Sequence, residues 1–177
     1  MTSPQVRAPQ PAYRPPAWKI AEHWFDQGEF VIDLGEPACF ACKWRDDRAP
    51  LHPSVSISDA WIRSKLERAH LVPHALGGSD YDLSNFVMLC QSCHKAAPDW
   101  RDPGVMLRWV RNRKHYLVVR YEEIVTTWES LWPGRPMPNP EAIDRAALSA
   151  LLIKNAGTHA HRLKASTIVA ALGQLDQ

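Results

Sequence analysis

The sequence contains no apolar run of about 18 residues, the length that a membrane-spanning helix needs, so it predicts no membrane contact. Residues 1–18 lack the apolar stretch of a secretory signal, and we therefore expect a cytoplasmic protein. The formal net charge is only +2, so overall charge does not by itself indicate an acidic or a basic partner. Hydrophobic residues make up 45% and charged residues 23%, which is typical of a globular chain.

Cysteine is also scarce, but all four cysteines fall into two CxxC pairs, Cys39–Cys42 and Cys90–Cys93. In a reducing compartment such pairs indicate metal binding or redox chemistry. Two pairs can supply four thiolates to one tetrahedral zinc ion, and the long gap between them costs little because loop-closure entropy grows slowly with length. The alternatives are four unrelated thiols or one redox pair, and the redox pair would leave the other pair unexplained. We predict a structural Zn²⁺ site, in which cysteines fill all four positions.

Apolar periodicity predicts an α+β fold, with a mixed first half and a mainly helical second half. The central order is a strand, a loop, a second strand and a helix, at 66–72, 73–84, 86–89 and 91–97. Residues 45–58 show no clear periodicity. The remaining predicted helices lie at 17–27, 105–113, 116–128, 140–155 and 165–172.

These patterns divide the chain into three expected regions. Residues 1–16 form a proline-rich tail, residues 17–100 a core domain, and residues 101–177 a helical extension. From residue 139 onward the sequence shows no motif that indicates catalysis or metal binding. That stretch either forms a homodimer or partner contact or simply packs.

The segment LERAHLVPHALGGSDYDLSNFVMLCQSCH joins several features in one short stretch. His70 precedes an apolar-x-Pro step, Gly77-Gly78 follows, Asn85 precedes the second strand, and His94 directly follows the second CxxC pair. In this combination the segment resembles the HNH endonuclease family. The resemblance implies the ββα-metal fold, also called the His-Me finger, held together by zinc knuckles. It also implies a metal-dependent endonuclease that hydrolyses phosphodiester bonds of nucleic acid, with DNA as the expected substrate.

The resemblance implies a role for each polar residue of the motif. His70 is the general base that activates water, Asn85 orients the histidine or holds the loop, and His94 binds the catalytic metal. These roles suit the chemistry, because a neutral imidazole accepts a proton near pH 7. A divalent cation neutralises charge that develops at the phosphate. We therefore expect Mg²⁺ or another divalent metal as a second cofactor.

The sequence departs from the family pattern at Ala69, where many members place an Asp or His as a second protein ligand for the catalytic metal. Glu67 lies on the same strand face as Ala69 and could replace that ligand. His74, which follows the proline, is another candidate. A further alternative is that His94 holds the ion with only water and phosphate oxygens, as suits weakly bound Mg²⁺.

Two groups of basic residues suit sequence-independent contact with phosphates, although an ordinary solvated surface explains the second group equally well. The first lies beside the predicted strand and the second on and after the helix at 105–113. The four tryptophans at 100, 109, 128 and 132 are interpreted as packing residues. The basic residues are Arg63, Lys65 and Arg68, and Arg108, Arg111, Arg113, Lys114 and Arg120.

Two other functions stay open beside the endonuclease. Ala69 is compatible with a degenerate HNH module that binds nucleic acid or a protein partner without cutting. The modest charge is compatible with an enzyme of the same fold that acts on a different substrate, such as a small molecule.

Overall fold

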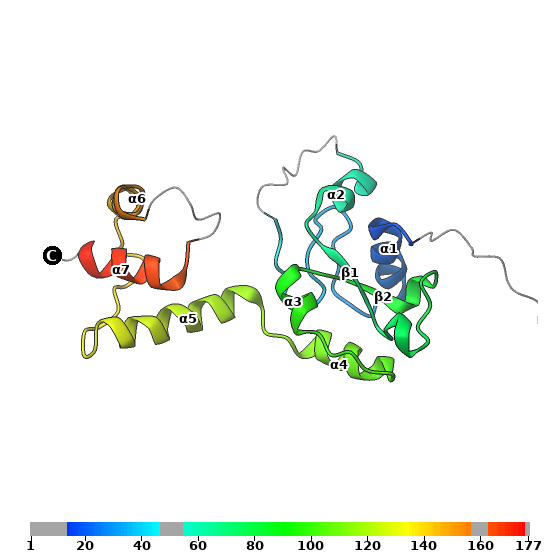
Figure 1. Cartoon of the computed structure of the whole chain (residues 1–177). Coiled ribbons are helices and arrows are strands. Elements are labelled where there is room, and N and C mark those ends of the chain that lie inside the picture. The colour runs from blue at the N-terminus through cyan, green and yellow to red at the C-terminus, as the bar shows by residue number, and fades with distance from the viewer. Residues whose placement is uncertain (1–13, 47–54, 157–162, 176–177) are drawn as a thin grey trace, which may run out of the picture. The chain divides into compact units, whose positions relative to one another are not determined.

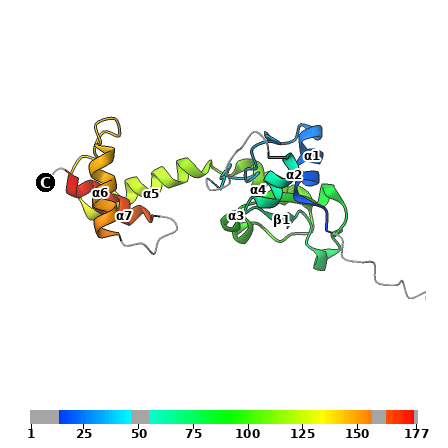
Figure 2. The same cartoon turned by 90° about the horizontal axis from the view of Figure 1, so that it is seen from above.

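A computed structural model describes residues 14–46, 55–156 and 163–175, and these form a mixed fold with one small antiparallel sheet (Figures 1 and 2). The α+β class is confirmed at this level. The described residues fall into two compact units that divide between His115 and Tyr116. The first unit contains α1 (Ala17–Gln27), α2 (Ile57–Arg63), β1 (Glu67–His70), the 3-10 turns η1 (His74–Leu76) and η2 (Leu83–Asn85), β2 (Phe86–Leu89), α3 (Gln91–Ala96) and α4 (Pro103–Asn112). The second contains α5 (Tyr116–Leu131), α6 (Arg145–Asn155) and α7 (Ala165–Leu175).

Among the described residues, no helix combines the length and the apolar composition that a membrane span requires.

The β-hairpin forms the centre of the first unit. β1 pairs antiparallel with β2, so that Glu67 lies opposite Leu89 and His70 opposite Phe86. All of β2 is buried, whereas in β1 only Ala69 is. Helix α1 packs on β2 and α3 packs on both strands, and Figures 1 and 2 both draw the hairpin between these helices. The second strand is therefore core, while the first forms the outer edge of the sheet.

The other edge of β2 is closed by side-chain and backbone donors. The indole Nε1 of Trp24 donates to the carbonyl of Phe86 at 2.6 Å, and the amide of Phe40 donates to the carbonyl of Met88 at 2.9 Å. These bonds satisfy carbonyl groups that point away from β1. They also tie α1 and the first CxxC turn to the same strand.

Helix α1 has the predicted bounds and the predicted buried face. Ile20, Ala21 and Trp24 are buried along it. Gly28 ends the helix with φ +64°, a left-handed conformation that glycine adopts without steric cost.

Helix α2 is absent from the sequence prediction, which leaves residues 45–58 without structure. It begins after Ser56, whose side chain accepts a hydrogen bond from the amide of Asp59 at 3.1 Å. Trp61 is its one buried residue and donates from Nε1 to the carbonyl of Leu34 at 2.8 Å. The helix is too short for periodicity to reveal it, and its signal is the serine cap.

The predicted start of the helix at 140–155 is wrong. Helix α6 begins at Arg145 because Asp144 is its cap, with a carboxylate oxygen that accepts from the amides of Ala146 and Ala147. Pro140 lies instead in a separate turn that closes with a hydrogen bond from the amide of Ala142 to the carbonyl of Asn139. Elsewhere the predicted elements are found with ends shifted by a few residues.

The second unit has its own core, made by α5 and α7 around Trp128, Val169 and Leu172. The indole of Trp132 packs against α7 so closely that a methyl group at Gly173 would lie 2.2 Å from its Cε2 atom. The packing interpretation is confirmed for Trp128 and Trp132, and Trp109 is half-buried beneath the Arg113 guanidinium. It is wrong for Trp100, which is 60% exposed.

Candidate metal centre and active site

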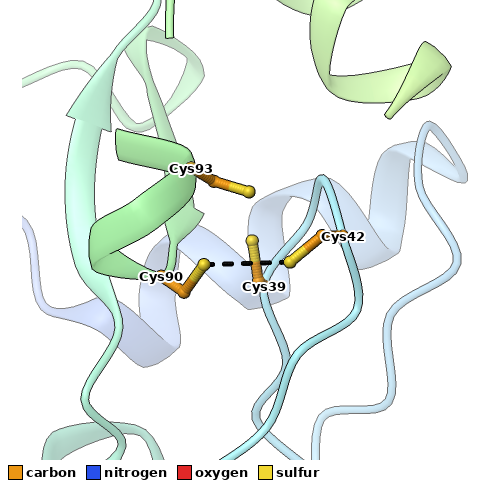
Figure 3. A group of neighbouring side chains, drawn as sticks. All are labelled: Cys39, Cys42, Cys90 and Cys93. Carbon is orange, nitrogen blue, oxygen red and sulfur yellow. Dashed lines mark hydrogen bonds between the residues drawn. The ribbon is translucent and has the colours of Figure 1, made fainter. Parts of the chain in front are cut away.

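The four cysteines meet at one point of the first unit. Figure 3 shows their sulfur atoms pointing toward one another, from the first CxxC turn and from the start of α3. The four sulfurs all lie within 4.8 Å of one another, and those of Cys42 and Cys90 are 3.7 Å apart. A tetrahedral zinc ion with Zn–S bonds of about 2.3 Å requires sulfur separations of roughly 3.8 Å. The buried donor set is therefore positioned to bind one metal ion, and its chemistry fits zinc.

The local turns explain how each pair is presented. In the first, the amide of Lys43 donates to the carbonyl of Cys39 at 2.9 Å, and Lys43 has φ +61°. In the second, Cys90 caps α3 and its carbonyl accepts from the amide of His94 at 2.8 Å. A metal bound to Cys90 would thus anchor the first turn of the helix that carries His94.

The close approach of the four thiols shifts their acidity in opposite directions. A hydrogen bond from Cys42 lowers the pKa of the Cys39 thiol to about 7, and hydrogen bonds from Cys39 and Cys42 lower the pKa of Cys90. Hydrogen bonding to Cys39 raises the pKa of Cys42 and of Cys93. The lowered pKa values of Cys39 and Cys90 favour the thiolate, which is the form that binds a divalent cation.

Asn85 holds the loop between the strands. Its side-chain oxygen accepts from the amide of Val72 at 2.9 Å, and its amide nitrogen donates to the carbonyls of Val72 at 3.1 Å and Ser79 at 2.9 Å. Gly78 makes this possible, because a methyl group there would lie 1.7 Å from the Val72 carbonyl oxygen. Of the two roles left open for Asn85, these contacts favour the loop-holding one.

His70 lies at the end of β1, where its ring packs on Phe86 at a centroid distance of 4.5 Å. Its Nε2 atom is 2.8 Å from an oxygen of Asp80. The other oxygen of Asp80 is 3.0 Å from Nδ1 of His74. The hydrogen bond from His70 lowers the pKa of the Asp80 carboxyl group, so the carboxylate form is favoured. Sequence reasoning missed Asp80, which no motif position marks.

His94 projects from α3 and pairs with a residue of β1. Its Nδ1 atom is 2.6 Å from an oxygen of Glu67, and both side chains are partly exposed. Among the described residues, the four cysteines are the one group of three or more side chains that could hold a metal. The structure thus brings Glu67 to His94, whereas His74 contacts Asp80.

The alternation of side chains along β1 organises these contacts. Ala69 is 1% exposed and shares a strand face with Glu67, while His70 shares the other face with Arg68. Glu67 and His70 therefore project from opposite faces of the outer strand of the sheet. Position 69 therefore holds a buried alanine side chain in place of the expected acid.

The candidate phosphate-binding residues of the first unit are exposed, and several have acidic or aromatic neighbours. Lys65 lies 3.5 Å from Asp46, Arg108 lies 3.8 Å from Asp102, and Arg111 contacts Glu29.

The Arg68 guanidinium is 3.4 Å from the carbonyl of Pro15, and Arg113 lies over the ring of Trp109 at 5.1 Å. The cluster on α4 is therefore partly neutralised locally, whereas Arg63 and Arg68 flank the start of β1.

Comparison with known proteins finds a family match for part of the chain. Residues 55–99 match the family model described as HNH endonuclease, which confirms the resemblance for this segment. The match includes His70, Asn85, His94 and the second CxxC pair, and it begins after the first pair. It indicates a nuclease or nucleic-acid-binding function. No curated protein and no solved structure matches the chain significantly.

Proposed function

We propose that this protein is a metal-dependent HNH endonuclease that hydrolyses phosphodiester bonds of nucleic acid, with DNA as the substrate. One observation carries the proposal. The β-hairpin and α3 of the matched segment present two imidazole–carboxylate pairs, His70 with Asp80 and His94 with Glu67. General-base hydrolysis of a phosphodiester requires one imidazole to take a proton and a second group to hold a cation.

His94 is the protein ligand of the catalytic metal in this proposal, and Glu67 supports it. The carboxylate of Glu67 either adds an oxygen ligand or accepts the Nδ1 proton of His94, which leaves Nε2 to bind the ion. In both roles Glu67 supplies the carboxylate that is missing at position 69. When bound, Mg²⁺ or another divalent metal supplies positive charge at the phosphate and at its leaving oxygen. The cysteine-bound zinc is structural and fixes the first turn of α3.

His70 acts as the general base and takes a proton from the attacking water. Its position at the end of the outer strand leaves room for a phosphate along that edge. Arg68 shares the strand face of His70, and its guanidinium suits a phosphate contact that reads no sequence. Arg63 and Lys65 extend this positive surface at the start of the strand, and the α4 group adds to it.

The location and the domain limits follow from the same interpretation. All four cysteines are free thiols, as a reducing cytoplasm would keep them. We place the nuclease core within residues 17–100 and regard the residues from 101 onward as a helical extension that contacts nucleic acid, a second copy or only the protein itself.

A second candidate is a module that binds DNA without cutting it, and buried Ala69 favours it. A site with one fewer protein ligand could have lost its catalytic ion while its basic surface still binds DNA. Salt-dependent DNA binding without cleavage under any divalent metal would support this function instead.

A plasmid-cleavage assay with Mg²⁺ or Mn²⁺ tests the endonuclease proposal. The wild-type protein should nick supercoiled DNA, and His70→Ala should slow nicking by about 10²–10⁴-fold, the usual contribution of a general base. His115→Ala, an exposed histidine outside the motif, is the matched control and should keep the wild-type rate. Unchanged cleavage by the His70 variant would remove His70 as the base.

A further inference from the structure

Asp80 lies between two histidines of the hairpin loop. One carboxylate oxygen is 2.8 Å from Nε2 of His70, and the other is 3.0 Å from Nδ1 of His74. The loop that presents Asp80 is fixed by Asn85, which bonds to the carbonyl of the preceding Ser79 at 2.9 Å. The partly exposed carboxylate therefore faces two imidazoles, on a loop whose backbone is held by Asn85.

This arrangement restricts the proton of a neutral His70 to one ring nitrogen. An ionised carboxylate can only accept hydrogen bonds, so a neutral imidazole that faces it must carry its proton on the facing nitrogen. In His70 that nitrogen is Nε2. The Nδ1 atom then keeps its lone pair and is the only ring atom able to take a proton from water. The opposite oxygen lies 3.0 Å from Nδ1 of His74, so a second imidazole also faces the carboxylate.

We propose that Asp80 is a positioning residue that holds His70 in the Nε2–H tautomer, so that Nδ1 is the proton-accepting atom. This proposal rests on the proposed function, because that function gives His70 the role of general base. In the reaction, Nδ1 takes one proton of the attacking water, the water oxygen bonds to phosphorus, and the bond from phosphorus to the leaving oxygen breaks. Loss of Asp80 would leave both tautomers accessible, and one of them blocks Nδ1.

The ring ¹⁵N signals of His70 report the tautomer directly, whether or not the protein cuts DNA. The spectrum is recorded on the full zinc-loaded chain, at a pH where the ring signals themselves show that His70 is neutral. The His70 signals are those that disappear in His70→Ala. The wild-type spectrum should show a protonated Nε2 and an unprotonated Nδ1. Asp80→Asn should give a mixture of both tautomers, because an amide can donate as well as accept.

Asp82→Asn is the matched control. Asp82 lies in the same loop and caps η2 through hydrogen bonds with Ser84, a role that asparagine also performs. This variant should keep the wild-type His70 spectrum and cleavage rate. Asp80→Asn should lower cleavage by about 10–100-fold. Zinc content equal to the wild type in each variant shows that the fold is kept.

The outcomes separate this inference from the proposed function. A His70 proton on Nδ1 in the wild type would overturn the inference without any variant, and so would an Asp80→Asn spectrum identical to the wild type. Absence of cleavage by the wild type would contradict the endonuclease, while the ring signals would still decide whether Asp80 sets the tautomer.

Discussion

At the residue scale, the loop of the hairpin depends on a position where no side chain fits. A methyl group on Gly78 would lie 1.7 Å from the Val72 carbonyl oxygen and 2.8 Å from Nδ2 of Asn85. The neighbouring Gly77 has φ +93° with nothing within 4 Å of an added methyl group. The two glycines therefore serve different purposes, one for space and one for backbone conformation.

We predict that Gly78→Ala destabilises the loop by about 1–3 kcal/mol, since overpacking forces the backbone to shift. Amide hydrogen exchange at Leu71 and Val72 measures this, because both amides donate to Asn85. Gly77→Asn is the control and should cost less, because asparagine tolerates a left-handed backbone. Equal protection in the two variants would contradict the steric argument.

We predict that Glu67→Gln weakens Mn²⁺ binding at His94 by about 10–100-fold, the usual cost of removing a group that supports a metal ligand. Calorimetric titration of the zinc-loaded protein measures it. Glu22→Gln removes an acid of similar exposure that pairs with Lys19 on α1, and it should bind Mn²⁺ as the wild type does. Unchanged affinity in the Glu67 variant would leave His94 as the sole protein ligand.

At the element scale, α3 depends on the cysteine site more than on its own sequence. It has 6 residues, far below the length at which an isolated helix is stable in water. Cys90 is at its N-cap position and Cys93 lies in its first turn, so a bound zinc would fix that turn relative to the first CxxC turn. The orientation of His94 follows from this anchor.

We predict about one zinc per chain by metal analysis, and loss of that zinc with lower thermal stability in Cys90→Ser. A zinc-binding cluster contributes its binding free energy to folding, so removing one thiolate weakens both. Ser92→Ala, at an exposed position of the same turn, should keep the metal. A folded wild-type preparation without zinc would contradict the structural role of the cysteines.

The sequence predicts some elements well for identifiable reasons. Helix α1 has a full amphipathic face and a terminal glycine, and Phe86–Leu89 is a short apolar run set between polar residues. Helix α2 buries only Trp61, so its apolar periodicity is too weak to predict it. At residues 139–145 both Asn139 and Asp144 fit a helix start, and only the packed structure shows which one caps α6.

For the candidate site, the sequence predicts the motif residues but not the side chains that they contact. His70, Asn85 and His94 stand at fixed spacings along the motif, and the four cysteines are evident as pairs. Asp80 reaches His70 only because the loop turns back at Gly78, which is a tertiary effect. Glu67 follows from strand alternation, although its contact with His94 depends on how α3 crosses the hairpin.

At the scale of the whole molecule, the positive and negative charges nearly balance. The formal net charge is +2, and several basic residues of the first unit have acidic neighbours of their own. DNA binding would therefore depend on the basic side chains beside β1 more than on a general positive field, and it should weaken as salt rises. The second unit, with its own core around Trp128, carries none of the motif residues.

Anomalous diffraction from Mn²⁺ tests the central claim most directly, in crystals of the inactive His70→Ala protein with a short DNA duplex. Our account predicts one Mn²⁺ ion bound to His94 and supported by Glu67, with a DNA phosphate between that ion and residue 70. A phosphate that contacts only the basic residues, or an ion bound away from His94 with residue 70 turned from the DNA, would contradict it.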